Sequence, residues 1–104
     1  MKEITAQQLR DKIDSKEDFQ LIDVREEYEH EAANIGGELI PMSGILAEVE
    51  RIDKTKPVVI YCRSGNRSSV VIQELERRHG FANLLNLKGG ILAWAREVDN
   101  SLSI

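Results

Sequence analysis

Residues 57–68 read PVVIYCRSGNRS and join two patterns of opposite character. The first half is apolar and rich in β-branched side chains, which is typical of a central strand buried on both faces of a parallel sheet. The second half, after Cys62, contains no large apolar residue. We therefore predict a core strand that ends at Cys62, a polar loop, and then a helix over Arg67–His79. Gly80 stands where a helix-ending glycine belongs.

Shorter apolar runs on both sides of this stretch alternate with helical patterns. Strands are predicted at Phe19–Val24, Glu38–Pro41 and Asn83–Leu87. Helices are predicted behind the capping box Thr5–Gln8, from a second capping-box spacing at Asp23–Glu26, over the apolar positions of 45–52 behind Ser43, and over Ile91–Val98. The alternation predicts an α/β fold, with a parallel sheet and helices on both faces. Ligands bind such sheets beyond the carboxyl ends of the strands, so the loop after Cys62 is the first candidate site.

The length and charge of the chain restrict its class. The 104 residues predict a single domain, 1–104. Lys and Arg number 14 against 18 Asp and Glu, a net charge of −4, which argues against binding nucleic acid through a basic face. The longest stretch without a charged residue is nine residues, Leu39–Ala47, whereas a membrane span needs about 18 apolar residues. We therefore expect no nucleic-acid or membrane partner and a cytoplasmic location.

Cys62 is the only cysteine, and His30 and His79 are the only histidines. A single cysteine forms no intramolecular disulfide and is insufficient for a cysteine-based zinc site. We expect no metal and no organic cofactor. Neither histidine is obviously placed to pair with Cys62, which weakens a protease or acyl-transfer interpretation.

Cys62 itself allows two interpretations. It could be a small core residue. However, a glycine-containing loop at a helix start can turn successive backbone N–H groups towards the sulfur and form an anion-binding nest. Such a nest stabilises a thiolate, and Arg63 and Arg67 add positive charge. We therefore favour a reactive thiol at Cys62.

A thiolate in an anion cradle suits phosphate-ester hydrolysis through a phosphocysteine or sulfur transfer through a persulfide. Four residues separate Cys62 from Arg67, one fewer than in the cysteine-phosphatase motif. The tighter loop fits a smaller anion, such as the outer sulfur of a persulfide. The spacing therefore favours sulfur transfer.

Three motifs in order span nearly the whole chain: LIDVRE at 21–26, CRSGNRS at 62–68 and NLKGGILAW at 86–94. Together they resemble the conserved segments of single-domain rhodaneses, a family of sulfurtransferases. The resemblance implies a rhodanese-like three-layer fold with a five-stranded parallel sheet. It also implies that Cys62 is the nucleophile that carries sulfur, with substrate held by the loop residues Arg63, Ser64, Gly65, Asn66, Arg67 and Ser68.

One segment departs from the family pattern. Many rhodaneses have a Gly-His pair before the second short strand, where this chain has Ala33-Asn34-Ile35-Gly36-Gly37. That variant, together with the ending Glu97–Leu102, is similar to rhodanese domains fused to adenylyltransferases that activate sulfur-carrier proteins. The resemblance implies small sulfur donors and acceptors, a sulfur-carrier protein or a cysteine desulfurase as partners. We expect a monomer or a weak dimer.

Asp23 and Arg25 are predicted to support the site, because they follow a strand at the edge where the Cys62 loop lies. Asp23 would brace Arg67 or a loop N–H group, and Arg25 would add to the positive field. The alternative is a surface ion pair of little energetic value. His30 lies among glutamates and is expected on a solvated helix face.

The expected function is that of a thiosulfate-type sulfurtransferase. Cys62 would take a sulfane sulfur from a donor and pass it to a thiophilic acceptor. The alternative is a persulfide carrier or docking module that serves a protein partner and turns over little free thiosulfate. A weaker alternative is a small cysteine-dependent phosphatase or arsenate reductase, which the loop length disfavours.

Overall fold

The computed structural model describes residues 1–104 and contains one sheet of five parallel strands. The strand order is β1-β5-β4-β2-β3. The strands are β1 (Glu3–Ile4), β2 (Gln20–Asp23), β3 (Glu38–Leu39), β4 (Val58–Tyr61) and β5 (Leu84–Leu87). The predicted α/β fold with a five-stranded parallel sheet is confirmed.

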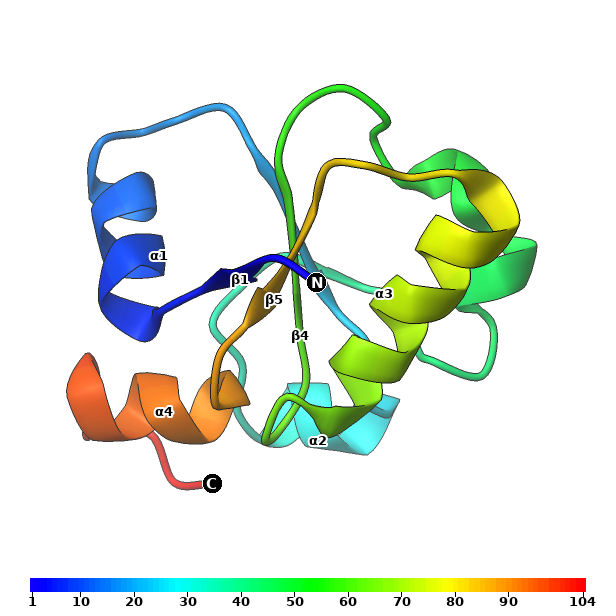
Figure 1. The fold of residues 1–104 in the computed structure, drawn as a ribbon. Coiled ribbons are helices and arrows are strands. Elements are labelled where there is room, and N and C mark those ends of the chain that lie inside the picture. The colour runs from blue at the N-terminus through cyan, green and yellow to red at the C-terminus, as the bar shows by residue number, and fades with distance from the viewer.

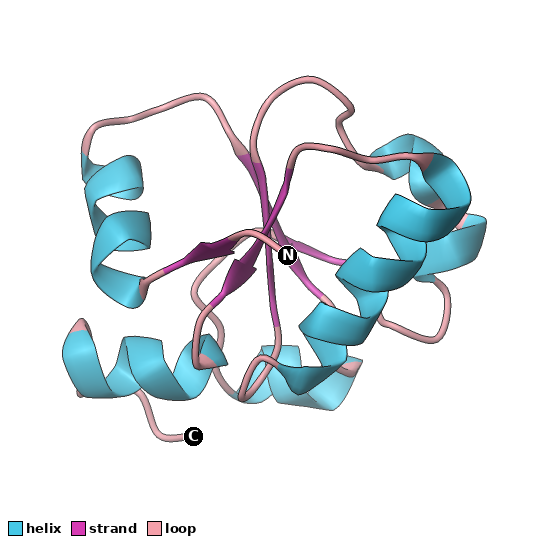
Figure 2. Ribbon diagram, in the orientation of Figure 1, coloured by secondary structure: helices cyan, strands magenta, loops and turns pink.

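Helices cover both faces of the sheet (Figures 1 and 2). Helices α1 (Ala6–Asp14) and α4 (Gly90–Glu97) lie together on one face. Helix α3 (Asn66–His79) covers the other face, near the 3₁₀ turns η1 (Ile45–Ala47) and η2 (Val49–Arg51). The short helix α2 (Glu27–Ala32) follows β2, near the start of α3. None of these helices has the length and apolar character that crossing a bilayer requires.

Strand β4 divides its side chains between the two cores. Val58 and Ile60, followed by Cys62, belong to the core beneath α3. Val59 and Tyr61 belong to the core beneath α1 and α4. All five residues are buried, as expected for a central parallel strand that is apolar on both faces. Cys62 therefore has a fixed position directly after the carboxyl end of the central strand.

The predicted helix over 45–52 is wrong as an element, although its burial pattern holds. Two separate 3₁₀ turns replace it, and Glu48 between them leaves the helical conformation with φ −128° and ψ 33°. Ile45 and Ile52 still reach the core, and Leu46 and Val49 pack against it. Periodicity of apolar residues thus located the buried side chains but could not distinguish an α-helix from two short turns.

The second capping box is also displaced from its predicted position. Glu26, not Asp23, is the N-cap residue of α2, and Glu29 closes the box. Asp23 ends strand β2 and accepts a hydrogen bond from the backbone N–H of Arg25. The two-residue strand β1 was expected only from the family resemblance, because so short a strand has no periodicity of its own.

The N-terminus of α4 packs directly on the backbone of the Cys62 loop. The N–H of Ile91 donates to the Cys62 carbonyl at 2.9 Å, and that of Leu92 donates to the Arg63 carbonyl at 3.1 Å. Gly90 has φ +61°, and a Cβ atom there would lie 2.4 Å from the Arg63 carbonyl oxygen. This close approach requires glycine at position 90.

Substituting Gly90→Ala should therefore destabilise the protein far more than Gly80→Ala does. Gly80 also has a positive φ, +68°, but a Cβ atom there meets nothing within 4 Å. The control should cost only the backbone strain, about 1 kcal/mol, while Gly90→Ala adds a clash with the loop. Urea unfolding of both variants measures the difference. Equal losses of unfolding free energy would show that the close approach of α4 is not needed.

Candidate active site

The sulfur of Cys62 lies in a cradle of hydrogen-bond donors. The backbone N–H groups of Gly65 and Ser68 point at Sγ, with N···S distances of 3.1 and 3.4 Å. The hydroxyl oxygen of Ser68 lies 3.3 Å from the same sulfur. Gly65 has φ +103°, which lets the chain turn from the strand into α3 within three residues of Cys62. Cys62 is only 1% exposed, so the cradle encloses the thiol.

The other predicted loop residues form the rim of the cradle. Arg63, Ser64 and Asn66 are exposed. Arg67, half-buried at the start of α3, reaches towards α2, where it pairs with Glu29. The structure therefore brings Gly65 and Ser68 into contact with the sulfur, whereas the remaining loop side chains lie around it.

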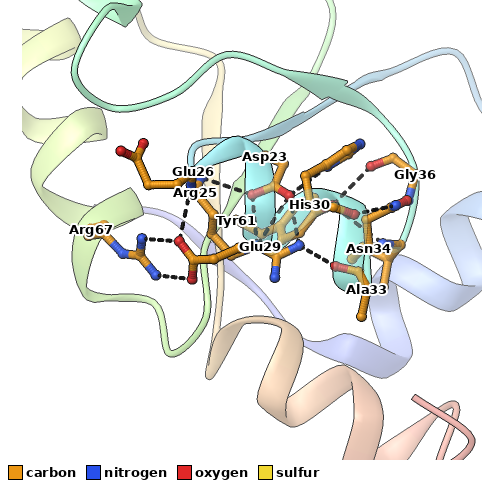
Figure 3. A network of polar contacts seen from close by, with 11 residues as sticks. Asp23, Arg25, Glu26, Glu29, His30, Ala33, Asn34, Gly36, Tyr61 and Arg67 are labelled. Atoms are coloured by element: carbon orange, nitrogen blue, oxygen red, sulfur yellow. Dashed lines mark hydrogen bonds and ion pairs between the residues drawn. The ribbon is translucent and has the colours of Figure 1, made fainter. Parts of the chain in front are cut away.

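Arg67 forms a two-pronged ion pair with Glu29 of α2, shown in Figure 3. The two N···O distances are 2.8 and 3.0 Å. The hydrogen bonds from Arg67 hold the pKa of the Glu29 carboxyl at about 2, and those to Glu29 raise the pKa of Arg67. The prediction that Asp23 braces Arg67 is therefore wrong, because Glu29 occupies that guanidinium.

Asp23 instead belongs to a second, buried network. Its carboxylate binds the guanidinium of Arg25 at 2.8 to 3.2 Å and contacts Nδ1 of His30 at 2.8 Å. Asp23 is fully buried and Arg25 is 3% exposed, so the surface ion pair is excluded. Burial would lower the pKa of Arg25, but hydrogen bonds and charge attraction from Asp23 outweigh it, so its pKa is raised. Arg25 therefore stays charged as a structural cation, neutralised by Asp23.

The segment that departs from the family pattern, residues 33–37, is hydrogen-bonded to this network. Arg25 donates to the Ala33 carbonyl at 2.6 Å, and the Tyr61 hydroxyl donates to the Gly36 carbonyl at 3.0 Å. Burial raises the pKa of Tyr61, so the hydroxyl stays protonated for this bond. Asn34 binds the His30 carbonyl and receives the N–H of Gly36, which closes the turn. The variant segment is thus an ordered wall beside the site.

Two partners of the site, Glu29 and Asn86, are not among the residues predicted from the sequence. Glu29 could not be singled out from the other glutamates of an acidic helix. Asn86 is a buried polar residue in the otherwise apolar strand LLNL, and that pattern could have revealed it. Its side chain accepts a hydrogen bond from the Ser68 hydroxyl at 2.5 Å and donates to the Gly65 carbonyl at 3.2 Å. His30, expected to be solvated, also contributes through its contact with Asp23.

A hollow of about 500 Å³ lies beside the cradle. It is lined by Val24, Glu26, Met42, Ser43 and Arg67. Its walls are mostly apolar apart from the charged groups of Glu26 and Arg67. No group of three or more His, Cys, Asp or Glu side chains is arranged to hold a metal ion. The arrangement can hold a sulfur anion by backbone N–H groups, and Arg67, which lines the hollow, directly precedes the donor Ser68.

Comparison with known proteins identifies the family. Residues 5–97 match the model of the family described as the rhodanese-like domain. A protein of Allochromatium vinosum named "Sulfurtransferase" is 40% identical over 90% of this chain and 88% of its own length. "Probable adenylyltransferase/sulfurtransferase MoeZ" of Mycobacterium tuberculosis is 36% identical over 91% of this chain. This chain spans only 25% of the length of that protein.

A solved structure shares the fold over the whole chain. The crystal structure of a rhodanese-like domain protein from Staphylococcus aureus is 32% identical, with a TM-score of 0.83. The similarity covers 100% of this chain and 98% of that one.

The ion pair between Glu29 and Arg67 makes stability depend on pH at the acid end. A carboxyl whose pKa falls from 4.5 to about 2 on folding stabilises the native state fully above pH 4.5. That contribution disappears as the pH falls through about 2. Glu29→Gln should remove it and flatten the loss of unfolding free energy in this window, measured by urea unfolding at several pH values. Glu31→Gln, an exposed position on the same helix, is the control. An unchanged slope for Glu29→Gln would contradict the assignment.

Proposed function

The chain belongs to the rhodanese-like domain family, and we propose that residues 1–104 act as one domain that transfers sulfur through a persulfide on Cys62. The observation that carries this proposal is the set of two backbone N–H groups directed at a single buried sulfur. Relatives named sulfurtransferases at 40% identity support sulfur transfer in general.

In the first step, the Cys62 thiolate attacks the sulfane sulfur of thiosulfate. The new S–S bond forms as the sulfur–sulfur bond of thiosulfate breaks, and sulfite leaves with the electron pair. The product is a Cys62 persulfide anion. The N–H groups of Gly65 and Ser68 are fixed donors to Sγ, which becomes the inner sulfur of the persulfide. Such preorganised donors stabilise the negative charge that Sγ carries before this step and regains when the persulfide is consumed.

In the second step, a thiophilic acceptor attacks the outer sulfur. Cyanide, for example, forms thiocyanate, and the electron pair of the broken S–S bond returns to Cys62 as the thiolate. Charge and atoms balance in both steps, with no oxidant, metal or organic cofactor required. A reducing compartment such as the cytoplasm would keep Cys62 available between cycles.

The phosphatase and arsenate-reductase alternatives have less support. The two oxygens of the Glu29 carboxylate already occupy the guanidinium of Arg67, which a phosphate would need as its clamp. The loop is also one residue shorter than in the phosphatase motif. These two features favour a small sulfur anion over a tetrahedral phosphate.

A second candidate function is a persulfide carrier that serves a protein partner. The relative MoeZ combines an adenylyltransferase with a sulfurtransferase in its name, and this chain matches 25% of its length. On this chain, Tyr28 of α2 is 72% exposed and lines a hollow of about 180 Å³ that Arg63 also borders. An exposed aromatic side chain beside the site suits contact with a protein, such as a sulfur-carrier protein or a cysteine desulfurase.

Sulfur loading separates the two candidates. An enzyme for small donors should turn over thiosulfate and cyanide continuously. A carrier should load from a cysteine desulfurase much faster than from thiosulfate. Tyr28→Ala should slow only loading from the protein donor, while the thiosulfate rate stays unchanged.

Exposure to thiosulfate should add the mass of one sulfur atom to the intact protein, and cyanide should remove it. Cys62→Ser should show neither change, because an oxygen cannot form a stable persulfide and the chain has no other thiol. Intact-protein mass spectrometry makes both measurements. A sulfur adduct on the Cys62→Ser variant would place the chemistry elsewhere.

Arg63 and Arg67 should affect thiosulfate turnover differently. The exposed Arg63 forms no ion pair, so Arg63→Ala should mainly raise KM, by about five-fold from an interaction of about 1 kcal/mol in a solvated setting. Added salt should shrink this effect. Arg67→Ala should also lower kcat, because it removes the ion pair with Glu29 that holds α2 against the start of α3.

Steady-state kinetics at low and high salt test this difference, with Arg78→Ala at the far end of α3 as a control of equal charge. If Arg63→Ala and Arg78→Ala have the same effect, Arg63 does not act locally on the donor.

A further inference from the structure

Asn86 connects the core of the sheet to both donors of the Cys62 cradle. It is 3% exposed and extends from β5 to the loop. Its Nδ2 donates to the Gly65 carbonyl at 3.2 Å, and its Oδ1 accepts from the Ser68 hydroxyl at 2.5 Å. A carbonyl oxygen can only accept, so the amide nitrogen has to face Gly65 and the amide oxygen has to face Ser68.

This orientation determines where the hydrogen of the Ser68 hydroxyl lies. Because Asn86 Oδ1 carries no hydrogen, Ser68 is the donor of their short hydrogen bond. A hydroxyl has one hydrogen, so the side of Ser68 Oγ that faces the sulfur, 3.3 Å away, presents lone pairs. A neutral Cys62 thiol can donate its hydrogen to these lone pairs. A thiolate cannot, and it receives a hydroxyl hydrogen only if Ser68 gives up Asn86.

We propose that Asn86 is a positioning residue that directs the Ser68 hydroxyl away from the sulfur and thereby sets the balance between thiol and thiolate at Cys62. The proposal rests on the proposed function only for the role of Cys62 as sulfur carrier. The two backbone N–H groups favour the thiolate, and the Ser68 hydroxyl as oriented by Asn86 favours the thiol. Asn86 would thus act on the nucleophile without touching it.

The native charged groups near Cys62 come from several elements, and none of them is altered by a substitution at Asn86. Arg63 follows Cys62 in the loop. Arg67 of α3 lies close enough to interact electrostatically with Cys62, and it is paired with Glu29 of α2. Asp23 and Arg25 form a neutralised pair at the end of β2, and His30 contacts Asp23 from α2. Lys88 is exposed in the turn between β5 and α4. A difference between Asn86 variants therefore reports the change at Asn86.

The loop has anchors besides Asn86, so its shape should survive substitution. Ser69 donates to the Gly65 carbonyl at 3.1 Å, and α4 holds the carbonyls of Cys62 and Arg63. Asn86→Leu should release the Ser68 hydroxyl to donate to the thiolate. Asn86→Asp should hold that hydroxyl more strongly and add negative charge near the sulfur. The two variants should therefore act in opposite directions.

The test is the rate of Cys62 alkylation by iodoacetamide as a function of pH. The midpoint of the profile should move to lower pH in Asn86→Leu and to higher pH in Asn86→Asp, each by about half a unit to one unit, where one unit is a tenfold change in the thiol–thiolate ratio. In a Ser68→Ala background the shift of Asn86→Leu should vanish, because the hydroxyl that carries the effect is absent.

Asn83→Leu is the matched control. Asn83 lies just before β5, and its Nδ2 donates to the carbonyls of Asp53 and Lys56 at 2.8 and 2.7 Å, at the opposite end of the strand. This variant should lose unfolding free energy but keep the wild-type alkylation profile. A merely structural Asn86 would behave in the same way.

Shifts of Asn86→Leu and Asn86→Asp in the same direction, or no shift in either, would overturn the proposal. If Asn86→Leu does not fold, Asn86→Asp decides together with the Ser68→Ala background, because the added negative charge raises the midpoint by itself. A rise that shrinks when Ser68 is alanine supports the proposal, and a rise of the same size with and without the hydroxyl overturns it. Alkylation needs no sulfur donor. Failure of the wild-type protein to take up sulfur would therefore overturn the proposed function and leave this test intact.

Discussion

The contact between the start of α4 and the backbone of the Cys62 loop is the constraint on which the rest of the site depends. Two N–H groups of α4 hold the carbonyls of Cys62 and Arg63, and Gly90 allows the two backbones to touch. With these carbonyls fixed, the chain turns at Gly65 and aims its N–H groups back at the sulfur. The third family motif, NLKGGILAW, is therefore distant in sequence from the second, CRSGNRS, but its hydrogen bonds determine the backbone shape of that loop.

Helix α2 is held beside the site by polar contacts of Glu29 and His30. The helix has six residues, none of them buried, so it has no apolar face with which to pack. Glu29 pairs with Arg67 of α3, and His30 contacts the carboxylate of Asp23. Buried ion pairs contribute little net stability after desolvation, but they hold elements in one arrangement. The pair of Asp23 and Arg25 fits that role, because Arg25 also fixes the segment that follows α2.

The patterns that predicted the fold correctly are local ones. The apolar run before Cys62, the long helix up to Gly80 and the motif order could all be recognised from neighbouring residues. The choice among polar partners could not. The sequence allowed Asp23 to pair with Arg67, with a loop N–H group or with its neighbour Arg25, and the structure shows the pair with Arg25, in a buried setting. Glu29, which is distant in the chain, pairs with Arg67 instead. The charges that would meet at the sheet edge were evident, but their pairing was not.

The same pairing separates the two arginines that flank the loop. Arg67 is held by Glu29 and adds little net charge, whereas Arg63 is exposed and unpaired. In the proposed sulfur transfer, Arg63 is therefore the cation open to an anionic donor, whereas Arg67 links the start of α3 to α2. The thiol beneath them is almost fully enclosed, so its reactivity depends on hydrogen bonds more than on solvent. Those hydrogen bonds come from two backbone groups fixed by the fold and from one hydroxyl whose direction a buried amide controls. The two proposals thus assign attraction of the donor and tuning of the thiol to different residues, Arg63 and Asn86, so that either property can change without the other.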